Sequence, residues 1–362
     1  MSRRRVTMAD VARRAGVSPT TASFVLADRR DMRISGEAEE RVRRAAQELG
    51  YRPNLTARGL RTSVTRTVAM ISDTIATTQF AGEVIHGALD AAGARDHVLF
   101  IAETKGDPDV EAQLVEGMLD RQVDGFIYAA MSTREVRLPA ALQDTRVVML
   151  NCWAQGTRAS SVLPDEVNAG RDAASVVLAA GHRQGVHVIG GRHITPATPE
   201  GVWAGQERMR GIEEAMAQAG TRLDGVAECD WQPADGHREV LRLLDAGTRP
   251  HALICLNDRV SMGAYQALQQ AGLNVPDDVC VVSFDDSDLA AWLRPSLTSI
   301  ALPHYDLGRT AVEVLLDGGI APRVHRIPMP VTLRSSHRTT SGSPRPTVTP
   351  TTTRQGPGEG PP

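Results

Sequence analysis

Apolar runs of strand length recur along residues 66–338. Because these runs show no alternation with polar residues, they are typical of strands that are buried on both faces. The runs are TVAMI (67–71), HVLFIAE (97–103), DGFIYAA (124–130), RVVMLN (146–151), GVHVIGG (185–191), HALICLN (251–257) and DVCVVSFDD (278–286).

Amphipathic stretches with helical periodicity lie between most of these runs, and several end in Gly, which commonly stops a helix. They span residues 80–93, 166–181, 207–220 and 259–272. Alternating strands and helices predict parallel, doubly wound sheets. A body of roughly 270 residues exceeds what one core usually holds, so we expect two α/β subdomains. Ligands in such folds bind beyond the carboxyl ends of strands.

A different pattern occupies residues 7–26, where two short helices are expected around a glycine. Thr7 can cap the first helix, with Asp10 three residues later, and Gly16 supplies the turn. Ser18 is a second N-cap, followed by Pro19 at the first helical position. Ala22, Val25 and Leu26 would pack inward, which leaves Thr20, Thr21, Ser23 and Phe24 facing outward or sideways. Such a pair is a helix-turn-helix, whose second helix enters the major groove of DNA.

A third helix is expected between Ser35, which can cap it, and Gly50, which ends it. Beyond it, Asn54 can cap a short helix from Leu55 to Arg61. The N-terminal part is therefore predicted to be all-α. The domain boundaries that we expect are 1–52 for the helix-turn-helix domain, 53–65 for a hinge helix and linker, 66–338 for the α/β body, and 339–362 for a disordered tail rich in Thr, Pro and Gly.

Charge is distributed unevenly along the chain, whose net charge is −3. Residues 1–66 contain 15 Arg and 7 acidic residues, a net charge of +8, which leaves −11 for the remainder. A basic N-terminal module on an acidic body is typical of a protein that meets a polyanion with one module only. A merely solvated charged surface is the alternative interpretation.

Other classes of protein are disfavoured. Cys152, Cys229, Cys255 and Cys280 are widely spaced, which argues against a zinc site or a disulfide framework and fits a reducing compartment. The N-terminus lacks the apolar core of a secretory signal, and no stretch reaches the length of a membrane span. We therefore expect a cytoplasmic protein without membrane contact.

The stretch TMADVARRAGVSPTTASFVL, together with RISGEAEERVRRAAQELGYRPNLTARGLRT, resembles the LacI/GalR family of repressors over nearly all of residues 6–62. The resemblance implies that Pro19, Thr20 and Phe24 read bases and that LTARGL forms a hinge helix. In that helix Ala57 would lie in the minor groove and Leu60 would wedge between base pairs. The full set of expected DNA-contacting residues is Thr7, Ser18, Pro19, Thr20, Thr21, Ser23, Phe24, Arg33, Asn54, Ala57, Arg58 and Leu60.

Phe24 departs from the family, most of whose members carry Arg at this position. Arg can bind guanine through two hydrogen bonds, whereas Phe cannot and would favour the methyl group of thymine. We therefore expect a shifted operator preference, and a half-site like that of the Arg-bearing relatives would contradict it. The alternative is that Phe24 packs inward and reads nothing.

The body resembles the effector domain that this family shares with periplasmic sugar-binding proteins. The match rests on segments such as ERMRG (207–211), CLND (255–258) and VVSFDD (281–286). It implies a cleft whose carboxylates, Asn and Arg bind hydroxyl groups and whose aromatic residues cover a ring. A sugar is thus the expected effector. The implied effector-binding residues are Asp73, Phe80, Asp165, Arg208, Trp231, Asn257 and Asp285.

Structural roles remain open for several of these residues. Asp73 and Asp165 can be helix caps. Arg208 can form a surface ion pair with Glu207 or Glu213. Trp231 can be ordinary packing.

The sequence contains no G-x-S-x-G, P-loop, H-E-x-x-H or G-x-G-x-x-G motif, so neither an enzyme nor a cofactor or metal site is expected. The expected partners are a near-palindromic duplex operator, a small-molecule effector and a second copy of the chain, because one helix-turn-helix reads one half-site. Residues 339–362 lack Leu, which excludes a coiled coil there and favours a dimer. A solute-binding protein, or a regulator whose body only dimerises, remain as alternatives.

Overall fold

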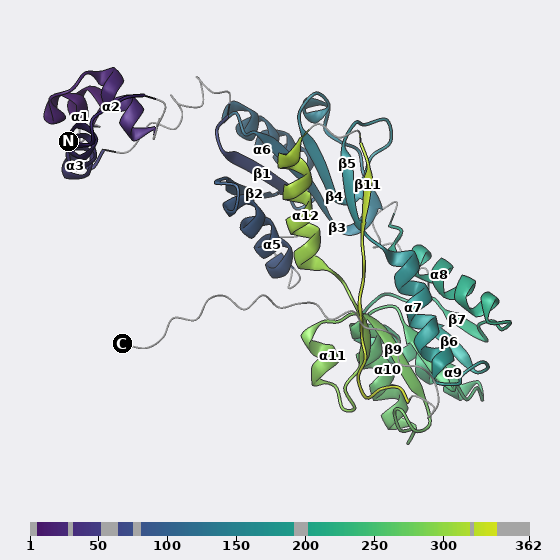
Figure 1. The fold of residues 1–362 in the computed structure, drawn as a ribbon. Coiled ribbons are helices and arrows are strands. Elements are labelled where there is room, and N and C mark those ends of the chain that lie inside the picture. Colours follow the sequence, from purple (N-terminus) through teal and green to yellow (C-terminus); the bar gives the residue numbers. More distant parts are fainter. Residues whose placement is uncertain are drawn as a thin grey trace, which may run out of the picture. The chain divides into compact units, whose positions relative to one another are not determined.

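The computed structural model describes residues 6–27, 32–51, 64–74, 81–191, 202–318 and 322–338. The expectations for the hinge helix and for the tail at 339–362 therefore lie outside the described residues. The chain divides into two compact units, one comprising Met1–Thr67 with Gln122–Asp124 and the other the remainder. We call residues 6–51 the head and residues 68–338 the body, and describe each by itself (Figure 1).

The head consists of helices α1 (Met8–Ala15), α2 (Pro19–Leu26) and α3 (Gly36–Leu49). Thr7 and Asp10 form a reciprocal capping box at the start of α1, and Gly16 ends that helix with φ 66°. Ser18 caps α2, where its side chain accepts a hydrogen bond from the amide of Thr21 at 3.0 Å. The caps and the glycine turn predicted from the sequence are therefore confirmed.

A small apolar core holds these helices together. Its buried members come from all three helices and include Val11, Ala22, Val25 and Val42. Two of the helices have only eight residues, too few to be stable alone in water. Their stability therefore depends on this shared core.

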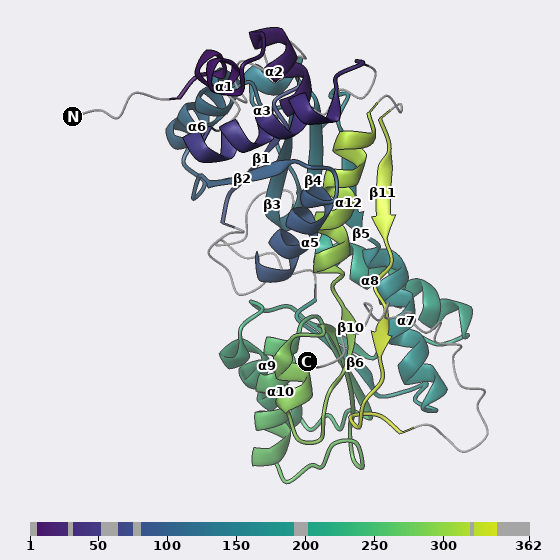
Figure 2. The same cartoon turned by 60° about the vertical axis from the view of Figure 1, so that its left-hand side comes forward.

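The body is built on two sheets of six strands each. The strand order of the first sheet is β11 (Val324–Ile327), β5 (Ser160–Pro164), β4 (Val147–Trp153), β3 (Gly125–Glu135), β1 (Thr67–Ser72) and β2 (Val98–Glu103). Its pairings β1–β3, β3–β4, β4–β5 and β5–β11 are parallel. Helices α5 (Ala81–Gly93) and α12 (His304–Asp317) lie side by side on one face of this sheet (Figures 1 and 2).

The strand order of the second sheet is β12 (Val331–Thr332), β10 (Thr298–Ala301), β9 (Cys280–Asp285), β8 (Ala252–Cys255), β6 (Val186–Ile189) and β7 (Gly225–Ala227). This sheet is parallel except for β12, which pairs antiparallel with β10. The remaining helices of the body are α6 (Pro108–Asp120), the short 3-10 helix η2 (Ala140–Leu142), α7 (Glu166–Ala179), α8 (Ala204–Gln218), α9 (Pro233–Asp245), α10 (Asp258–Gln270) and α11 (Asp288–Trp292).

The expected two-subdomain α/β body is confirmed, and we call the parts built on the first and second sheets the first and second halves. The chain passes between the halves after β5, after β10 and after β11. Each half therefore contains strands from distant parts of the sequence.

One strand expectation was wrong. Residues 97–103 were expected to be buried on both faces, but β2 lies at the edge of its sheet with Val98, Phe100 and Ile101 exposed by 57%, 38% and 37%. An apolar run does not reveal whether its strand has a neighbour on both sides. Strands β5, β7, β10, β11 and β12 were not predicted as strands, because a strand of five residues or fewer carries little periodicity.

Close packing of α7 on α8 depends on two glycines. A Cβ atom at Gly211 would lie 1.9 Å from the carbonyl oxygen of Val167, and one at Gly170 would lie 2.1 Å from that of Arg208. No side chain can occupy either position without moving backbone. The glycines therefore bring the backbone of Arg208 against α7, whose first residue is Glu166.

Candidate functional site

The second helix of the head carries accessible side chains on the side away from its core. Pro19 and Thr20 are exposed, and Thr21, Ser23 and Phe24 are partly exposed. Arg33, in the segment before α3, is also exposed. This distribution leaves the helix face that was predicted to read DNA open to a ligand.

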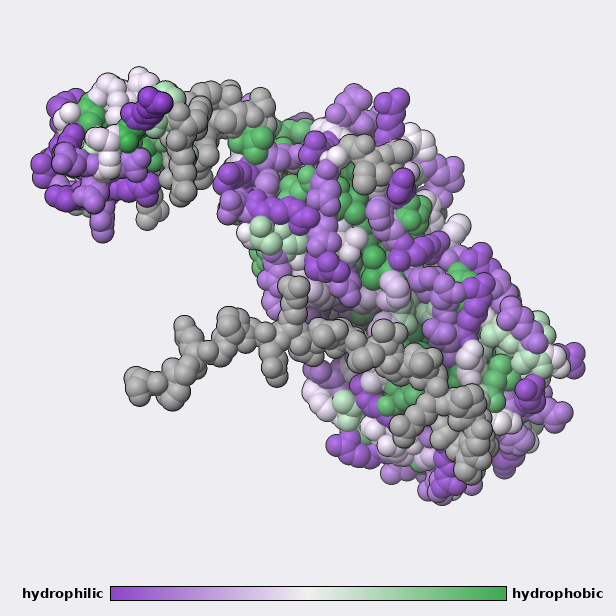
Figure 3. All heavy atoms as spheres, in the orientation of Figure 1, coloured by the Kyte–Doolittle hydropathy of each residue, from purple (hydrophilic) through white to green (hydrophobic). Residues whose placement is uncertain are grey.

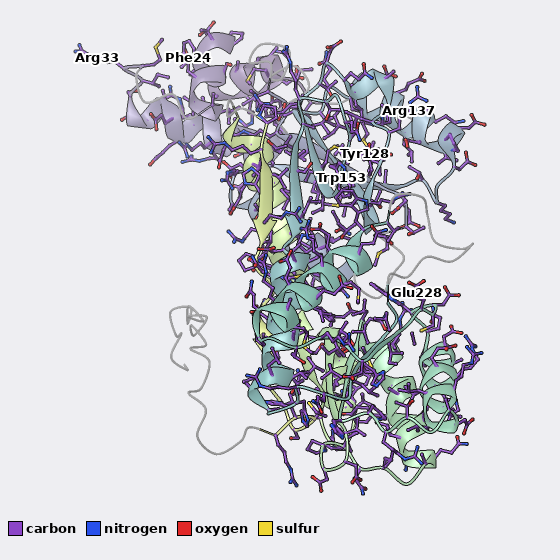
Figure 4. All side chains as sticks on the ribbon, turned by 90° about the vertical axis from the view of Figure 1, so that its right-hand side faces the viewer. Phe24, Arg33, Tyr128, Arg137, Trp153 and Glu228 are labelled. Atoms are coloured by element: carbon purple, nitrogen blue, oxygen red, sulfur yellow. The ribbon has the colours of Figure 1, made fainter. Side chains whose placement is uncertain are left out.

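Phe24 is partly exposed and is not one of the apolar side chains packed against the head core. Its neighbours Ala22 and Val25 are buried in that core instead. Figure 4 shows Phe24 and Arg33 on the head. The alternative that Phe24 is a core residue is therefore not favoured.

Four of the expected DNA-contacting residues, Asn54, Ala57, Arg58 and Leu60, lie outside the described residues, as does Phe80 of the effector set. Thr7 and Ser18 act as helix caps, so their backbone amides and side chains are ordered at the helix starts. Helix starts with oriented N–H groups suit contacts to phosphate.

In the body, Arg208 is the centre of a buried polar cluster. Its Nε and Nη2 donate hydrogen bonds to the two carboxylate oxygens of Glu166 at 2.7 and 3.3 Å, and Nη1 donates one to the carbonyl oxygen of Leu256 at 2.5 Å. Arg208 and Glu166 are each 1% exposed. The alternative of a surface ion pair with Glu207 or Glu213 is thus excluded, because the partner is Glu166 and the pair is buried.

Aromatic rings cover the guanidinium of Arg208. Its Cζ lies 4.6 Å from the ring centroid of Phe284 and 5.1 Å from that of Trp231. The indole Nε1 of Trp231 donates a hydrogen bond to the carbonyl oxygen of Gly190 at 3.1 Å, which orients the ring. Such cation–π contacts strengthen when water is excluded.

Asp285 ends β9 in the left-handed backbone region, with φ 101°. Its Oδ1 lies 3.8 Å from Nη1 of Arg208. Burial raises the pKa of Asp285 to about 8, Arg208 opposes that rise, and the carboxylates of Asp258 and Glu166 add to it. One arginine is thus surrounded by more than one carboxylate, so the cluster can hold a proton or accept hydrogen bonds from hydroxyl groups.

Asn257 and Asp258 shape the adjoining loops. Asn257 caps α10 by accepting a hydrogen bond from the amide of Val260, and its Nδ2 donates one to the carbonyl oxygen of Trp231 at 3.3 Å. The buried carboxylate of Asp258 accepts hydrogen bonds from the amide and hydroxyl of Ser287 and from the hydroxyl of Ser299. These contacts fix the chain that follows Asp285.

The predicted site residues are only partly brought together. Arg208, Trp231, Asn257 and Asp285 form one connected cluster in the second half. Asp73 lies at the end of β1, where it binds Nη2 of Arg134 at 2.8 Å and the amide of Met131 at 2.9 Å. It also lines a cavity of about 180 Å³ in the first half.

Asp165 acts as the N-cap of α7, with its carboxylate accepting hydrogen bonds from the amide and Nδ2 of Asn168. The capping alternative considered for it therefore matches the geometry. The next residue along the chain, Glu166, is the one that reaches Arg208.

Sequence reasoning missed Glu166, Asp258 and His304. Glu166 directly follows Asp165, and Asp258 completes the CLND segment, so adjacent motifs could have pointed to both. His304 begins α12 and is near Arg208, whose charge adds to burial in lowering the pKa of His304 to about 4. No sequence signal marks it, because its neighbours come from distant segments.

Three further findings concern the described residues as a group. None of their His, Cys, Asp and Glu side chains form a group of three or more that could hold a metal ion. None of their helices combines the length and apolarity that crossing a membrane requires. The four cysteines are buried and unbridged.

Known protein families match both parts of the chain. Residues 7–54 match the bacterial regulatory proteins of the lacI family, and residues 174–337 match the periplasmic binding protein-like domain. The ribose operon repressor of Haemophilus influenzae is 31% identical over 315 residues, covering 86% of this chain and 91% of the relative. The sucrose operon repressor of Escherichia coli is 32% identical over 336 residues, covering 90% and 98%.

Solved structures share the fold over nearly the whole chain. The lac repressor dimer bound to operator and the anti-inducer ONPF matches with a TM-score of 0.74 and 22% identity, covering 92% of this chain and 99% of that one. The complex of the transcriptional regulator CelR with cellobiose matches with a TM-score of 0.62 and 27% identity, covering 92% and 100%.

Proposed function

This chain belongs to the lacI family of bacterial regulatory proteins, and we propose from its two sites that it is a repressor whose operator binding is controlled by a sugar. It is a DNA-binding transcription regulator with an effector-binding body. The observation that carries the proposal is the coexistence, in one chain, of an open recognition helix and a buried arginine cluster at the ends of body strands.

DNA binding is assigned to the head. The caps of α1 and α2 present backbone N–H groups to phosphates, and Pro19, Thr20 and Phe24 face the bases. The hinge residues Asn54, Ala57, Arg58 and Leu60 join them when the operator is bound. Phe24 selects thymine through its methyl group rather than guanine.

Effector binding is assigned to Arg208, Trp231, Asn257 and Asp285, and the resemblance adds Asp73, Phe80 and Asp165 to this set. Carboxylate, amide and guanidinium groups beside an indole face suit the hydroxyls and the apolar face of a sugar. Relatives named for ribose and sucrose operons, and a similar fold that holds cellobiose, support this class of ligand.

Homodimerisation is supported by the apolar edge of the first half. Val98, Phe100 and Ile101 on β2 are exposed together with Leu89 on α5 and Val110 on α6. An exposed edge strand with apolar side chains invites pairing with another chain. Figure 3 shows hydrophobic spheres at the surface beside otherwise hydrophilic ones on the side of the body that carries β2 and α5 in Figure 1.

The remaining assignments follow the same proposal. The domains are 1–52 for DNA binding, 53–65 for the hinge, 66–338 for effector binding and dimerisation, and 339–362 for a tail. The protein works in the cytoplasm, where its operator is, and no catalytic step, cofactor or metal is part of the mechanism.

Selection of operators from random duplexes tests the proposal. The full chain should enrich near-palindromic sites with thymine opposite Phe24. The Phe24→Arg variant should instead enrich guanine at that position. Each protein should bind a site that carries the other's base about 1–3 kcal/mol more weakly per mismatched base. Gln47→Ala, at an exposed position of α3 outside the predicted DNA-contacting set, serves as the control and should leave the enriched site unchanged.

The effector half of the proposal is tested by repeating the binding with D-ribose, sucrose and cellobiose. One of them should change operator affinity by at least about fivefold, within the range usual for coupled sites. Binding to the operator that none of these sugars alters would favour a body that only dimerises. A chain that binds sugar without enriching any duplex would instead be a solute-binding protein.

A further inference from the structure

A cavity of about 350 Å³ lies at the end of the first sheet, apart from the Arg208 cluster. Its walls come from β3, β4, β5 and β11, and from the start of α8. None of Arg208, Trp231, Asn257 and Asp285 lines it, and Glu166 is the one residue that it shares with the Arg208 cluster. Its volume falls within the range of small-molecule sites.

Two tryptophans form an aromatic corner in this cavity. The ring centroids of Trp153 and Trp203 are 4.6 Å apart, with 57° between the ring planes. Trp203 is 42% exposed, which is unusual for so large an apolar side chain. Trp153 lies on the half of the body that is built on the first sheet (Figure 4). An indole face left open in a concave site is a surface for a flat or ring-shaped ligand.

The position of Trp203 is fixed by backbone contacts. Its amide donates a hydrogen bond to the carbonyl oxygen of Thr133 at 2.8 Å, and Arg134 forms an antiparallel bridge with Val202. On β4, the carbonyl oxygen of Trp153 accepts a hydrogen bond from the amide of Val136 at 2.8 Å. The backbone at both tryptophans is therefore held by the end of β3 and the chain that follows it.

Both carboxylates in the wall are already matched by arginines. Glu207 is bound to Arg326 at 3.3 Å and to Arg210 at 3.0 Å, and Glu166 is bound to Arg208. A charged ligand would have to displace one partner of these ion pairs. A hydroxyl group of an uncharged ligand can instead bind the carboxylate lone pairs and guanidinium N–H groups that the ion pairs leave unused. Thr133, Thr157 and Ser161 add hydroxyls, and the exposed Arg323 adds donors at the rim.

From this geometry we infer a second binding site of the body, in which an uncharged carbohydrate ring packs against Trp153 and Trp203 and donates hydrogen bonds to Glu207. Because Arg326 of β11 and Glu207 of α8 belong to different halves of the body, a ring bound here would also brace the junction between them. The inference concerns a site beyond the Arg208 cluster, although it shares with the proposed function the idea of a sugar ligand. The ring can be a free monosaccharide or one unit of a longer effector that also reaches Arg208 past Glu166.

Fluorine NMR of the full chain labelled with 5-fluorotryptophan tests the inference, because the chain has four tryptophans and each reports on a different place. Single Trp→Phe variants assign the signals of Trp153, Trp203, Trp231 and Trp292. The probes are D-glucose, D-ribose, sucrose and cellobiose, with adenine as an aromatic comparator. We expect saturable shifts of the Trp153 and Trp203 signals with at least one sugar and none of the Trp292 signal, whose residue is 69% exposed on α11.

Affinity in variants gives a second measurement. Trp203→Ala should weaken the sugar isotherm read at Trp153 by roughly tenfold, the loss of one aromatic contact. Trp292→Ala, the matched control at another exposed tryptophan, should change it by less than about twofold. A common isotherm at Trp153 and Trp231 that only disaccharides produce would identify one ligand spanning both sites, whereas separate isotherms with a monosaccharide would identify independent ones.

The outcomes separate this inference from the proposed function. Shifts confined to Trp231 would overturn the second site and leave the Arg208 site standing. Shifts confined to Trp153 and Trp203 would support the second site and contradict the assignment of the effector to Trp231. No shift at either tryptophan of the cavity with any sugar, or a shift with adenine alone, would overturn a carbohydrate site.

Discussion

Arg208 and Glu166 owe their role to burial. Taking both charges out of water costs several kcal/mol per ion, and their attraction repays that cost only when the geometry is good and the remaining polar atoms are bonded. Here the pair is bidentate, and the guanidinium also bonds to a carbonyl oxygen and lies against two rings. Removing one partner would leave the other charge buried and unmatched.

We expect Glu166→Gln to lower the free energy of unfolding of the body by about 3 kcal/mol, the usual cost of breaking a buried pair. Glu214→Gln is the matched control, because Glu214 binds Arg171 at 2.6 Å with both side chains about 40% exposed, and an exposed pair is worth under about 1 kcal/mol. Urea denaturation followed by circular dichroism measures both. Equal losses in the two variants would show that burial does not set the strength of the Arg208 pair.

His304 gives the body a predictable response to acid. Burial and the charge of Arg208 lower the pKa of His304 to about 4, from 6.5 for an unperturbed histidine. Above pH 6.5 the ring is neutral in both the folded and the unfolded chain, so it has no effect. As pH falls from 6.5 to 4, the unfolded chain takes up a proton that the folded chain refuses, and stability is lost.

The expected loss from His304 is about 3 kcal/mol at pH 4, since each unit of pKa shift corresponds to about 1.4 kcal/mol. The raised pKa of Asp285 acts in the opposite direction, because the folded chain holds its proton below about pH 8. The comparison is therefore between wild type and His304→Gln, in urea titrations from pH 8 to pH 4. The variant should lose less stability toward pH 4, whereas His86→Gln, at an exposed histidine, should follow wild type. Parallel curves for wild type and His304→Gln would refute this account.

Among the elements, β2 and β11 occupy the two edges of the first sheet but present different surfaces. β2 exposes three large apolar side chains along six residues, whereas β11 exposes Val324 among polar ones. The difference points to β2 as the edge that a second copy of the chain covers.

We expect Phe100→Asp to shift the protein from dimer to monomer in sedimentation velocity, because a charge would be buried in the interface. Operator affinity should fall by at least about tenfold, since a single head reads only half of a palindrome. Val324→Asp, at a valine 58% exposed on the opposite edge, should leave both measurements unchanged. Dimers that survive Phe100→Asp but not Val324→Asp would place the interface at β11.

For the whole molecule, the proposed switch requires that the sugar site and the operator site share one coupling free energy. If a sugar weakens operator binding by some factor, the operator must weaken sugar binding by the same factor. We expect titration calorimetry of the sugar, with and without saturating operator, to give the ratio of affinities that operator titrations give with and without sugar. Trp292→Ala serves as a control that should keep both ratios. Ratios that disagree by more than about threefold would mean that the two ligands do not act on one equilibrium.

The sequence alone determined those features that depend on neighbours along the chain. The capping box at Thr7, the turn at Gly16 and the cap at Ser18 involve residues within four positions of each other, so their pattern is local and specific. The alternation of apolar runs and helical stretches likewise predicted the two α/β halves. Arg208, Trp231, Asn257 and Asp285 were named from the resemblance to the family's effector domain, and Asn257 and Asp285 also follow apolar runs, where the fold class places ligands.

Tertiary structure decided which of those side chains meet and what else surrounds them. Glu166 and Arg208 are 42 residues apart and touch because two glycines let α7 and α8 approach. Trp153 and Trp203 form a corner only because β3 and the start of α8 are hydrogen-bonded. The edge position of β2 follows from strand order, which an apolar run does not encode. Contacts of this kind depend on the packing of distant segments, and a periodic pattern specifies only which face of each segment is buried.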